Sequence, residues 1–211
     1  MSEKIFRSQW RGFLKQQPTE ESLQTCREML SAAKCEEKIL TGEVYHWQNN
    51  VFVYLEGIGV PADPAVLLAP LHEFLSDWPG ADVFRKWIPM MDIFHFNEPE
   101  SIGHWRRKTP PETRVGKVGL LRPEMVASYI YYHYGLQEER SFGGDKYEII
   151  ALHENILFGY FELPVVIETP PQEPRLKTRS MPENWADAKI STHFFRWKEH
   201  NSSLLPIPSL L

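Results

Sequence analysis

The feature that most constrains the fold is a weak internal repeat. Residues 49–56 read Asn-Asn-Val-Phe-Val-Tyr-Leu-Glu, and residues 155–162 read Asn-Ile-Leu-Phe-Gly-Tyr-Phe-Glu. Phe52 then aligns with Phe158, an offset of 106 residues. A repeat of this length indicates two copies of one structural unit, so the motifs of the two copies can be compared position by position.

A second anchor gives nearly the same offset. The stretches at residues 14–20 and 119–125 each run from a strand-like segment through a proline towards a helical pattern. Pro18 aligns with Pro123, an offset of 105 residues. With 211 residues in all, each copy has about 100 residues, enough for a small domain with its own core.

Each copy predicts the same order of elements. A strand is followed by a helix that opens at proline, where the missing N–H costs nothing, then by a hairpin with asparagine in its turn, and then by a second helical region. In the first copy these are strand 6–15, helix 19–33, hairpin strands 38–47 and 51–57, and helical regions 64–75 and 84–93. In the second copy they are strand 115–121, helix 124–138, hairpin strands 146–152 and 156–163, and helical region 182–198.

This β-α-β-β-α order predicts an α+β fold of two tandem ferredoxin-like modules. We place the modules at residues 1–108 and 109–211, with residues 109–111 as the linker. The helices cover one face of such a sheet, and the other face must pack against something else. A second, similar sheet in the same chain would make an intramolecular dimeric α+β barrel. The alternative is two independent modules joined by the linker.

Composition and charge exclude several classes. The net charge of −5 provides no positive field for nucleic acid, and we interpret the basic run Arg106–Lys108 as a solvated linker. No stretch is apolar over 18 residues, so no membrane partner is expected. Cys26 and Cys35 have neither disulfide nor zinc spacing and predict free thiols in a reducing, cytoplasmic environment.

The helix predicted at 124–138 carries Tyr129 and His133 at spacing i, i+4, which places them on one helix face. A phenol beside an imidazole suits general acid–base catalysis. The alternative is that these side chains and Tyr132 belong to an amphipathic core face. The first copy has Gln24 and Glu28 at the matching distances after its proline, which indicates that one copy has lost a site that the other retains.

Tryptophan and charged residues form the other candidate constellation. The first copy has Trp87 and Asp92, and the second has Arg196 and Trp197. Tryptophan faces suit the apolar surface of a sugar, while Arg and Asp can bind hydroxyl groups. A tryptophan near a helix end is also typical of core packing.

Together these segments resemble the L-rhamnose mutarotases, a family with the dimeric α+β barrel fold. That family has a proline turn, a helix with Tyr-x-x-x-His, a hairpin ending like L-L-F-x-Y-x-E and a helix with R-W-W-x-x-M-x-D. The residues that follow this pattern are Pro123, Tyr129, His133 and Leu157–Glu162 in the second copy, Arg85, Trp87, Met90 and Asp92 in the first copy, and, in part, Arg196 and Trp197.

The resemblance implies anomer interconversion of a monosaccharide such as L-rhamnose, without metal or cofactor. His133 would be the main proton carrier and Tyr129 its partner. The substrate would be bound by Trp197, which would stack on it, and by Arg196, Tyr132, Trp87 and Asp92.

Two alternatives from other classes stay open. One is a non-catalytic small-molecule-binding or structural α+β barrel protein. The other is a barrel monooxygenase of the cofactor-free or haem-handling kind, which rests on the shared fold alone. The expected partner is a small molecule, and the pseudo-dimer could pair further into a homodimer.

Overall fold

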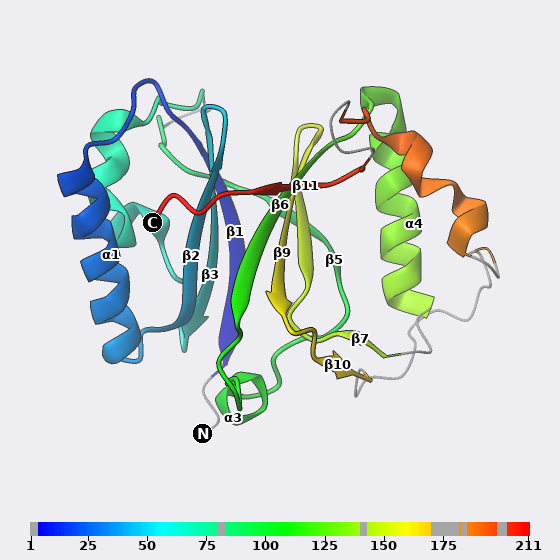
Figure 1. Cartoon of the computed structure of the whole chain (residues 1–211), viewed down its shortest axis with the longest axis horizontal. Helices are drawn as coiled ribbons and strands as arrows, with labels where there is room; N and C mark the ends of the chain where they lie inside the picture. Colours follow the sequence, from blue (N-terminus) through cyan, green and yellow to red (C-terminus); the bar gives the residue numbers. More distant parts are fainter. Residues whose placement is uncertain (1–3, 80–82, 140–142, 170–181, 183–184, 198–201) are drawn as a thin grey trace. The chain divides into compact units, whose positions relative to one another are not determined.

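The computed structural model describes residues 4–79, 83–139, 143–169, 182, 185–197 and 202–211 (Figure 1). The chain divides into two compact units. Unit 1 comprises residues 1–90, 99–109 and 207–211, and unit 2 comprises residues 91–98 and 110–206. No helix among the described residues is long and apolar enough to cross a membrane; the cytoplasmic location stays a prediction.

Unit 1 packs one long helix against an antiparallel sheet of strand order β2-β3-β1-β4 (Figure 1). The helix α1 begins after Thr19, whose side chain accepts a hydrogen bond from the Ser22 N–H at 3.2 Å. The elements of this unit are β1 (Ile5–Phe13), α1 (Glu20–Cys35), β2 (Ile39–Trp47), β3 (Asn50–Ile58), α2 (Pro64–Leu67), the 3₁₀ helix η1 (Ala69–Phe74), β4 (Ile88–Pro89) and α3 (Ile102–Trp105).

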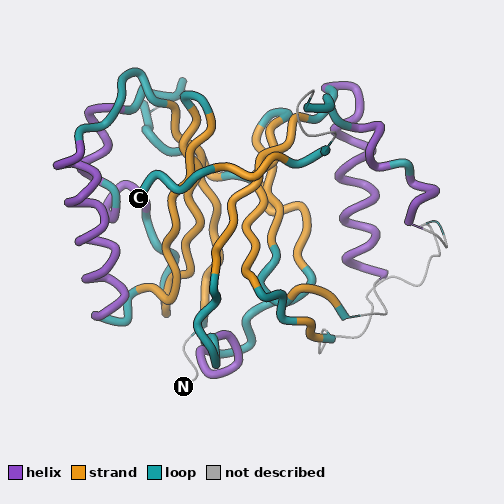
Figure 2. The backbone as a smooth tube through the Cα atoms, in the orientation of Figure 1, coloured by secondary structure: helices purple, strands orange, loops and turns teal. Residues whose placement is uncertain are grey.

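Unit 2 repeats this plan with an antiparallel sheet of order β11-β6-β9-β8-β5 and the long helix α4. The tube in Figure 2 shows the strands and the long helix of this unit. A small ladder joins β10 to β7. The elements are β5 (Met91–His95), β6 (Thr113–Leu120), η2 (Pro123–Met125), α4 (Val126–Glu139), β7 (Gly144–Asp145), β8 (Ile149–His153), β9 (Ile156–Leu163), β10 (Ile167–Glu168), η3 (Trp185–Ala188), η4 (Ile190–His193) and β11 (Leu205–Ile207).

The repeated segment lies on the inner strand of each sheet and sends alternate side chains to opposite faces. On β3, Val53 and Leu55 join the core beneath α1, whereas Tyr54 and Glu56 lie on the other face and are fully buried. The second unit's counterparts Tyr160 and Glu162 are also buried. The Tyr-x-Glu of the repeat is therefore a buried polar pair in both units.

Short segments join each unit from the other half of the sequence. Residues 91–95 follow β4 directly, yet they form β5 and pair with β8 in unit 2. At the far end, residues 207–211 belong to unit 1 and extend its sheet beyond β2, where the His46 N–H donates to the Pro208 oxygen at 3.1 Å. The Leu210 N–H likewise donates to the Val44 oxygen at 2.8 Å. Each sheet thus gains an edge segment that is distant in sequence.

The predicted α+β class, the two long helices and both hairpins are confirmed. The helix predicted at residues 84–93 is wrong, because β4 and β5 occupy half of this range and the rest of it is not helical. Pro89 has no N–H to continue a helix and biases Ile88 towards extended backbone, and the Met90 N–H then donates to the Gln9 oxygen on β1 at 2.9 Å. The helix predicted at 182–198 is replaced by the short helices η3 and η4, with residues 183–184 and 198 outside the described residues.

Candidate functional site

Tyr129 and His133 lie together on α4, as their spacing predicts. Their rings stack with centroids 3.9 Å apart, and the side chains are 2% and 7% exposed. His133 Nδ1 lies 3.0 Å from the Tyr129 carbonyl oxygen, and Phe94 and Trp185 meet the imidazole edge-on at 5.6 and 5.4 Å. The pair is thus packed on several sides by protein.

Burial moves both pKa values away from neutrality. Desolvation lowers the pKa of His133 to about 4, with a smaller lowering by His193, against the opposing effect of the hydrogen bond to the Tyr129 carbonyl. Desolvation, with a contribution from Glu148, raises the pKa of Tyr129 well above its ordinary value. At neutral pH His133 is a weak base and Tyr129 a weak acid, so the pair is poorly suited to move protons.

The lowered pKa predicts a pH-dependent stability. The unfolded chain binds a proton at His133 below about pH 6.5, whereas the folded chain does so only near pH 4. Stability is therefore complete above pH 6.5, and about 2 kcal/mol should be lost between pH 8 and pH 5. Urea unfolding at the two pH values measures the loss. The His133→Phe variant should lose less, and equal losses in both proteins would contradict the assignment.

The other predicted substrate-binding residues do not gather around this pair as a group. Tyr132 does lie near it, edge-on to Trp185 at 6.5 Å. Asp92, on β5, accepts a hydrogen bond from His95 Nδ1 at 2.8 Å. Trp87 is a core residue of unit 1, 4% exposed. Trp197 is half-buried.

Arg196 instead lines a pocket of about 540 Å³ in unit 2. The pocket lies beside the start of α4 and the end of η4, and its lining residues include two arginines, two phenylalanines, a glutamate, a serine and a threonine. Its lining residues are Arg122, Glu124, Met125, Ser191, Thr192, Phe194, Phe195 and Arg196. A volume of this size suits a small organic ligand.

A serine–histidine pair that was not predicted from the sequence adjoins this pocket. Ser128 Oγ lies 2.7 Å from His193 Nε2 and also lies 3.9 Å from the sulfur of Met125, a lining residue. Ser128 is in the first turn of α4, and His193 is the last residue of η4. The two residues are 65 apart in sequence, so no local spacing could have indicated the pair.

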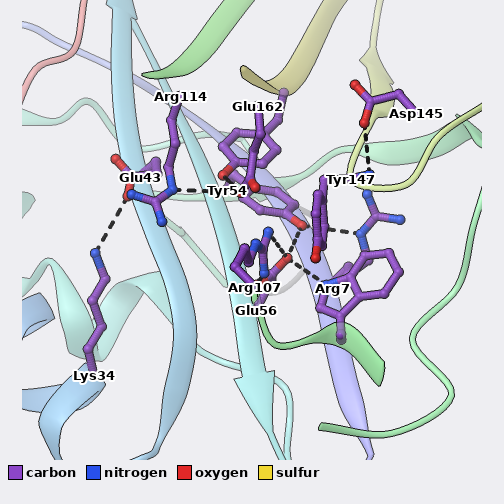
Figure 3. Close-up of polar contacts among 12 residues, drawn as sticks. Arg7, Lys34, Glu43, Tyr54, Glu56, Arg107, Arg114, Asp145, Tyr147 and Glu162 are labelled. Atoms are coloured by element: carbon purple, nitrogen blue, oxygen red, sulfur yellow. Dashed lines mark hydrogen bonds and ion pairs between the residues drawn. The ribbon is translucent and has the colours of Figure 1, made fainter. Parts of the chain in front are cut away.

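A buried polar cluster lies in unit 1 around Glu56 (Figure 3). Its carboxylate accepts hydrogen bonds from the Tyr54 hydroxyl at 2.6 Å, from Trp105 Nε1 at 2.8 Å and from both terminal nitrogens of Arg107. Burial alone would raise the pKa of Glu56, but the Arg107 charge and these hydrogen bonds hold it below its ordinary value. Both oxygens are bound by protein groups, so the cluster fastens residues 105–107 to β3.

This cluster corrects the interpretation of Arg106–Lys108 as a solvated linker. The Arg107 side chain is 9% exposed because it pairs with the fully buried Glu56, whereas Arg106 bonds the exposed Glu37 at 2.8 Å. In unit 2 the Tyr160 hydroxyl donates to Glu162 at 2.6 Å, and Arg114 lies 3.7 Å from the same carboxylate. The repeat thus encodes a buried tyrosine–glutamate pair in both units, and in each unit an arginine from outside the repeated segment lies near the carboxylate.

Comparisons with known proteins assign no family. No family model matches the chain, and no curated protein matches it. Among solved structures, a Fusobacterium nucleatum protein described as "Putative monooxygenase" aligns over 100% of this chain and 94% of its own, with 10% sequence identity and a TM-score of 0.40. A similarity at that level assigns neither family nor activity to this chain.

The prediction of a sugar mutarotase is wrong. The physical reason lies in the site: the pKa of His133 is about 4, and the Tyr129 ring covers its imidazole. The residues expected to hold the sugar are divided between the units, with Trp87 in the core of unit 1.

Proposed function

We propose that unit 2 binds a small organic anion with an apolar body in the pocket beside α4. The observation that carries this proposal is the pairing of Arg122 and Arg196 with Phe194 and Phe195 around about 540 Å³. Guanidinium groups bind carboxylates and phosphates in a fork of parallel hydrogen bonds, and aromatic rings supply the apolar wall.

Arg122 is held in a position to serve as an anchor. Its Nε donates to the Phe194 carbonyl oxygen at 3.4 Å, and its guanidinium lies over the Phe195 ring at 5.4 Å. Among the described residues, the bond from Nε to the Phe194 oxygen is the one hydrogen bond of the Arg122 side chain. Its two terminal nitrogens can therefore bind a ligand. Glu124 also lines the pocket, so the walls carry two positive charges against one negative charge. The surplus favours an anion over a neutral sugar.

The proposal predicts binding that depends on the ligand's charge. Isothermal titration with benzoate should give measurable heat, while benzamide, its neutral analogue, should bind at least about tenfold more weakly. Arg122→Gln should weaken benzoate binding by about tenfold or more. Arg27→Gln removes an exposed guanidinium of α1 that pairs with Glu20, and it should change nothing. Equal binding of benzoate and benzamide, or equal loss in both variants, would refute the anion site.

For the architecture, we infer that the two modules form an intramolecular dimeric α+β barrel. Support comes from the repeated element order and from the buried polar residues that both sheets carry on the face away from the helix, such as Glu56 and Glu162. Residues 1–108 and 109–211, produced as separate chains, should then form a one-to-one complex. Two stable monomers would contradict this architecture. The resemblance to the mutarotase family's fold stays a prediction.

A further inference from the structure

His193 occupies a place in unit 2 that an apolar residue fills in unit 1. The Arg122 N–H donates to the His193 oxygen at 2.8 Å, as the Lys15 N–H donates to the Phe74 oxygen at 2.9 Å. The residues that follow, Phe194 and Leu75, form antiparallel bridges with Leu121 and Leu14, which directly follow β6 and β1. Phe74 and His193 are therefore equivalent, and both are buried.

This equivalence shows that the fold does not require an imidazole at the position. A phenylalanine meets the packing requirement in unit 1, and burying an imidazole costs free energy unless its nitrogens are bonded. His193 bonds Ser128 through Nε2, whereas Nδ1 is buried without a hydrogen-bond partner among the described residues. A costly polar side chain in an apolar position indicates a role beyond packing.

The geometry of the pair is that of a nucleophile and its base. The distance of 2.7 Å between Ser128 Oγ and His193 Nε2 is within the range for direct proton transfer. Ser128 is the third residue of α4, so the positive end of the helix dipole favours negative charge at its oxygen. Met125, the last residue of η2 and three residues before Ser128, forms part of the pocket wall together with Thr192, the residue before His193.

We propose that Ser128 and His193 form a catalytic dyad that transfers the acyl group of an anionic ester bound in the adjoining pocket. Ser128 Oγ bonds to the ester carbonyl carbon while its proton passes to His193 Nε2. The carbon–oxygen bond to the alcohol breaks, and His193 returns the proton to the departing alcohol. Water then releases the acid by the reverse steps and restores the serine. The substrate class rests on the proposed function, because Arg122 and Arg196 would hold the anionic group.

A covalent probe tests the dyad independently of the anion site. A fluorophosphonate should label the full-length protein at one serine, and peptide mass spectrometry should place the label on Ser128. Ser128→Ala and His193→Phe should abolish the labelling. Phe is native at the equivalent place in unit 1, and a circular-dichroism melt of His193→Phe checks that the variant is folded.

Ser22 supplies the matched control. It is the third residue of α1, and its hydroxyl donates to the Thr19 oxygen at 2.8 Å without a histidine partner. Ser22→Ala should therefore leave the labelling unchanged. The Ser128→Cys, Cys35→Ser variant should react with iodoacetamide at least about tenfold faster than the same variant with His193→Phe added, because His193 would promote the thiolate. Absence of labelling at Ser128, or equal reactivity of the two cysteines, would overturn the dyad.

Hydrolysis separates the dyad from the anion site. The mono-p-nitrophenyl ester of succinate should be cleaved, with the rate falling by about 10²-fold or more in Ser128→Ala. Arg122→Gln should raise KM for this ester and leave the neutral p-nitrophenyl acetate unaffected. If acetate and succinate esters are cleaved equally well at Ser128, the dyad stands and the anion site fails. If benzoate binds but neither ester is cleaved above the Ser128→Ala rate, the anion site stands and the dyad fails.

Discussion

Replacing Glu56 by alanine is expected to destabilise the protein by about 3–5 kcal/mol, because it removes one partner of a buried ion pair. The Arg107 side chain is 9% exposed and pairs with a carboxylate that is fully buried. Trp105 Nε1 and the Tyr54 hydroxyl lose their acceptor at the same time. Urea unfolding followed by circular dichroism at pH 7 measures the change.

A surface ion pair provides the control for this prediction. Glu20 bonds Arg27 at 2.6 Å, but its side chain is 76% exposed, so Glu20→Ala should cost less than about 1 kcal/mol. The double variant Glu56→Leu, Arg107→Leu removes both charges and should recover part of the loss. A cost at Glu56 no larger than that at Glu20 would show that the cluster does not stabilise the fold.

The same carboxylate should make the protein sensitive to acid. The pKa of Glu56 is lower in the folded chain than in the unfolded chain, so its contribution is present above the ordinary glutamate value near 4.5 and is lost as the pH falls below it. This loss falls at lower pH than that expected from His133, so the two can be separated in a pH series.

Replacing Trp87 by alanine is expected to cost about 3–5 kcal/mol, the usual result of deleting a large aromatic side chain from a core. Trp87 packs in the core of unit 1, where its ring approaches Gly12 so closely that a Cβ there would lie 2.8 Å from the ring. A ligand-stacking tryptophan would instead be partly exposed, and its removal would weaken binding with little change in stability. Thermal and urea unfolding distinguish the two outcomes.

Phe84 is the matched control, since it is an aromatic residue of the same segment with 76% of its surface exposed. Phe84→Ala should change the free energy of unfolding by no more than about 0.5 kcal/mol. A normal unfolding curve for Trp87→Ala would contradict the core assignment.

The correct predictions of the fold rest on local sequence patterns and on their repetition in the two halves. The alternation in residues 50–58 and the proline-led helices are signals within one segment, and the repeat supplied each of them twice. The exchange of β5 and of residues 207–211 between the halves depends on edge pairing between distant segments, which has no local signal. Residues 84–93 carry two conflicting local signals: their apolar pattern favours a helix, and Pro89 favours extended backbone.

The site was predictable only where spacing along one helix decides contact. The i, i+4 rule placed Tyr129 beside His133 correctly, but the sequence does not show how deeply a helix face is buried, and burial changed the chemistry of the pair. Ser128 and Arg107 were missed because their partners, His193 and Glu56, are brought near by the tertiary fold. Aligning Phe74 with His193 also required the backbone hydrogen bonds of the structure.

The return of residues 207–211 to unit 1 sets an order of events during synthesis on the ribosome. The strand β2 emerges early, but the backbone groups of Val44 and His46 meet their partners only after Leu210 has been translated. The β2 edge of the unit 1 sheet therefore stays unpaired until residues 208–210 have been synthesised. A nascent chain stalled before residue 207 should be more susceptible to protease near β2 than the released chain of residues 1–211.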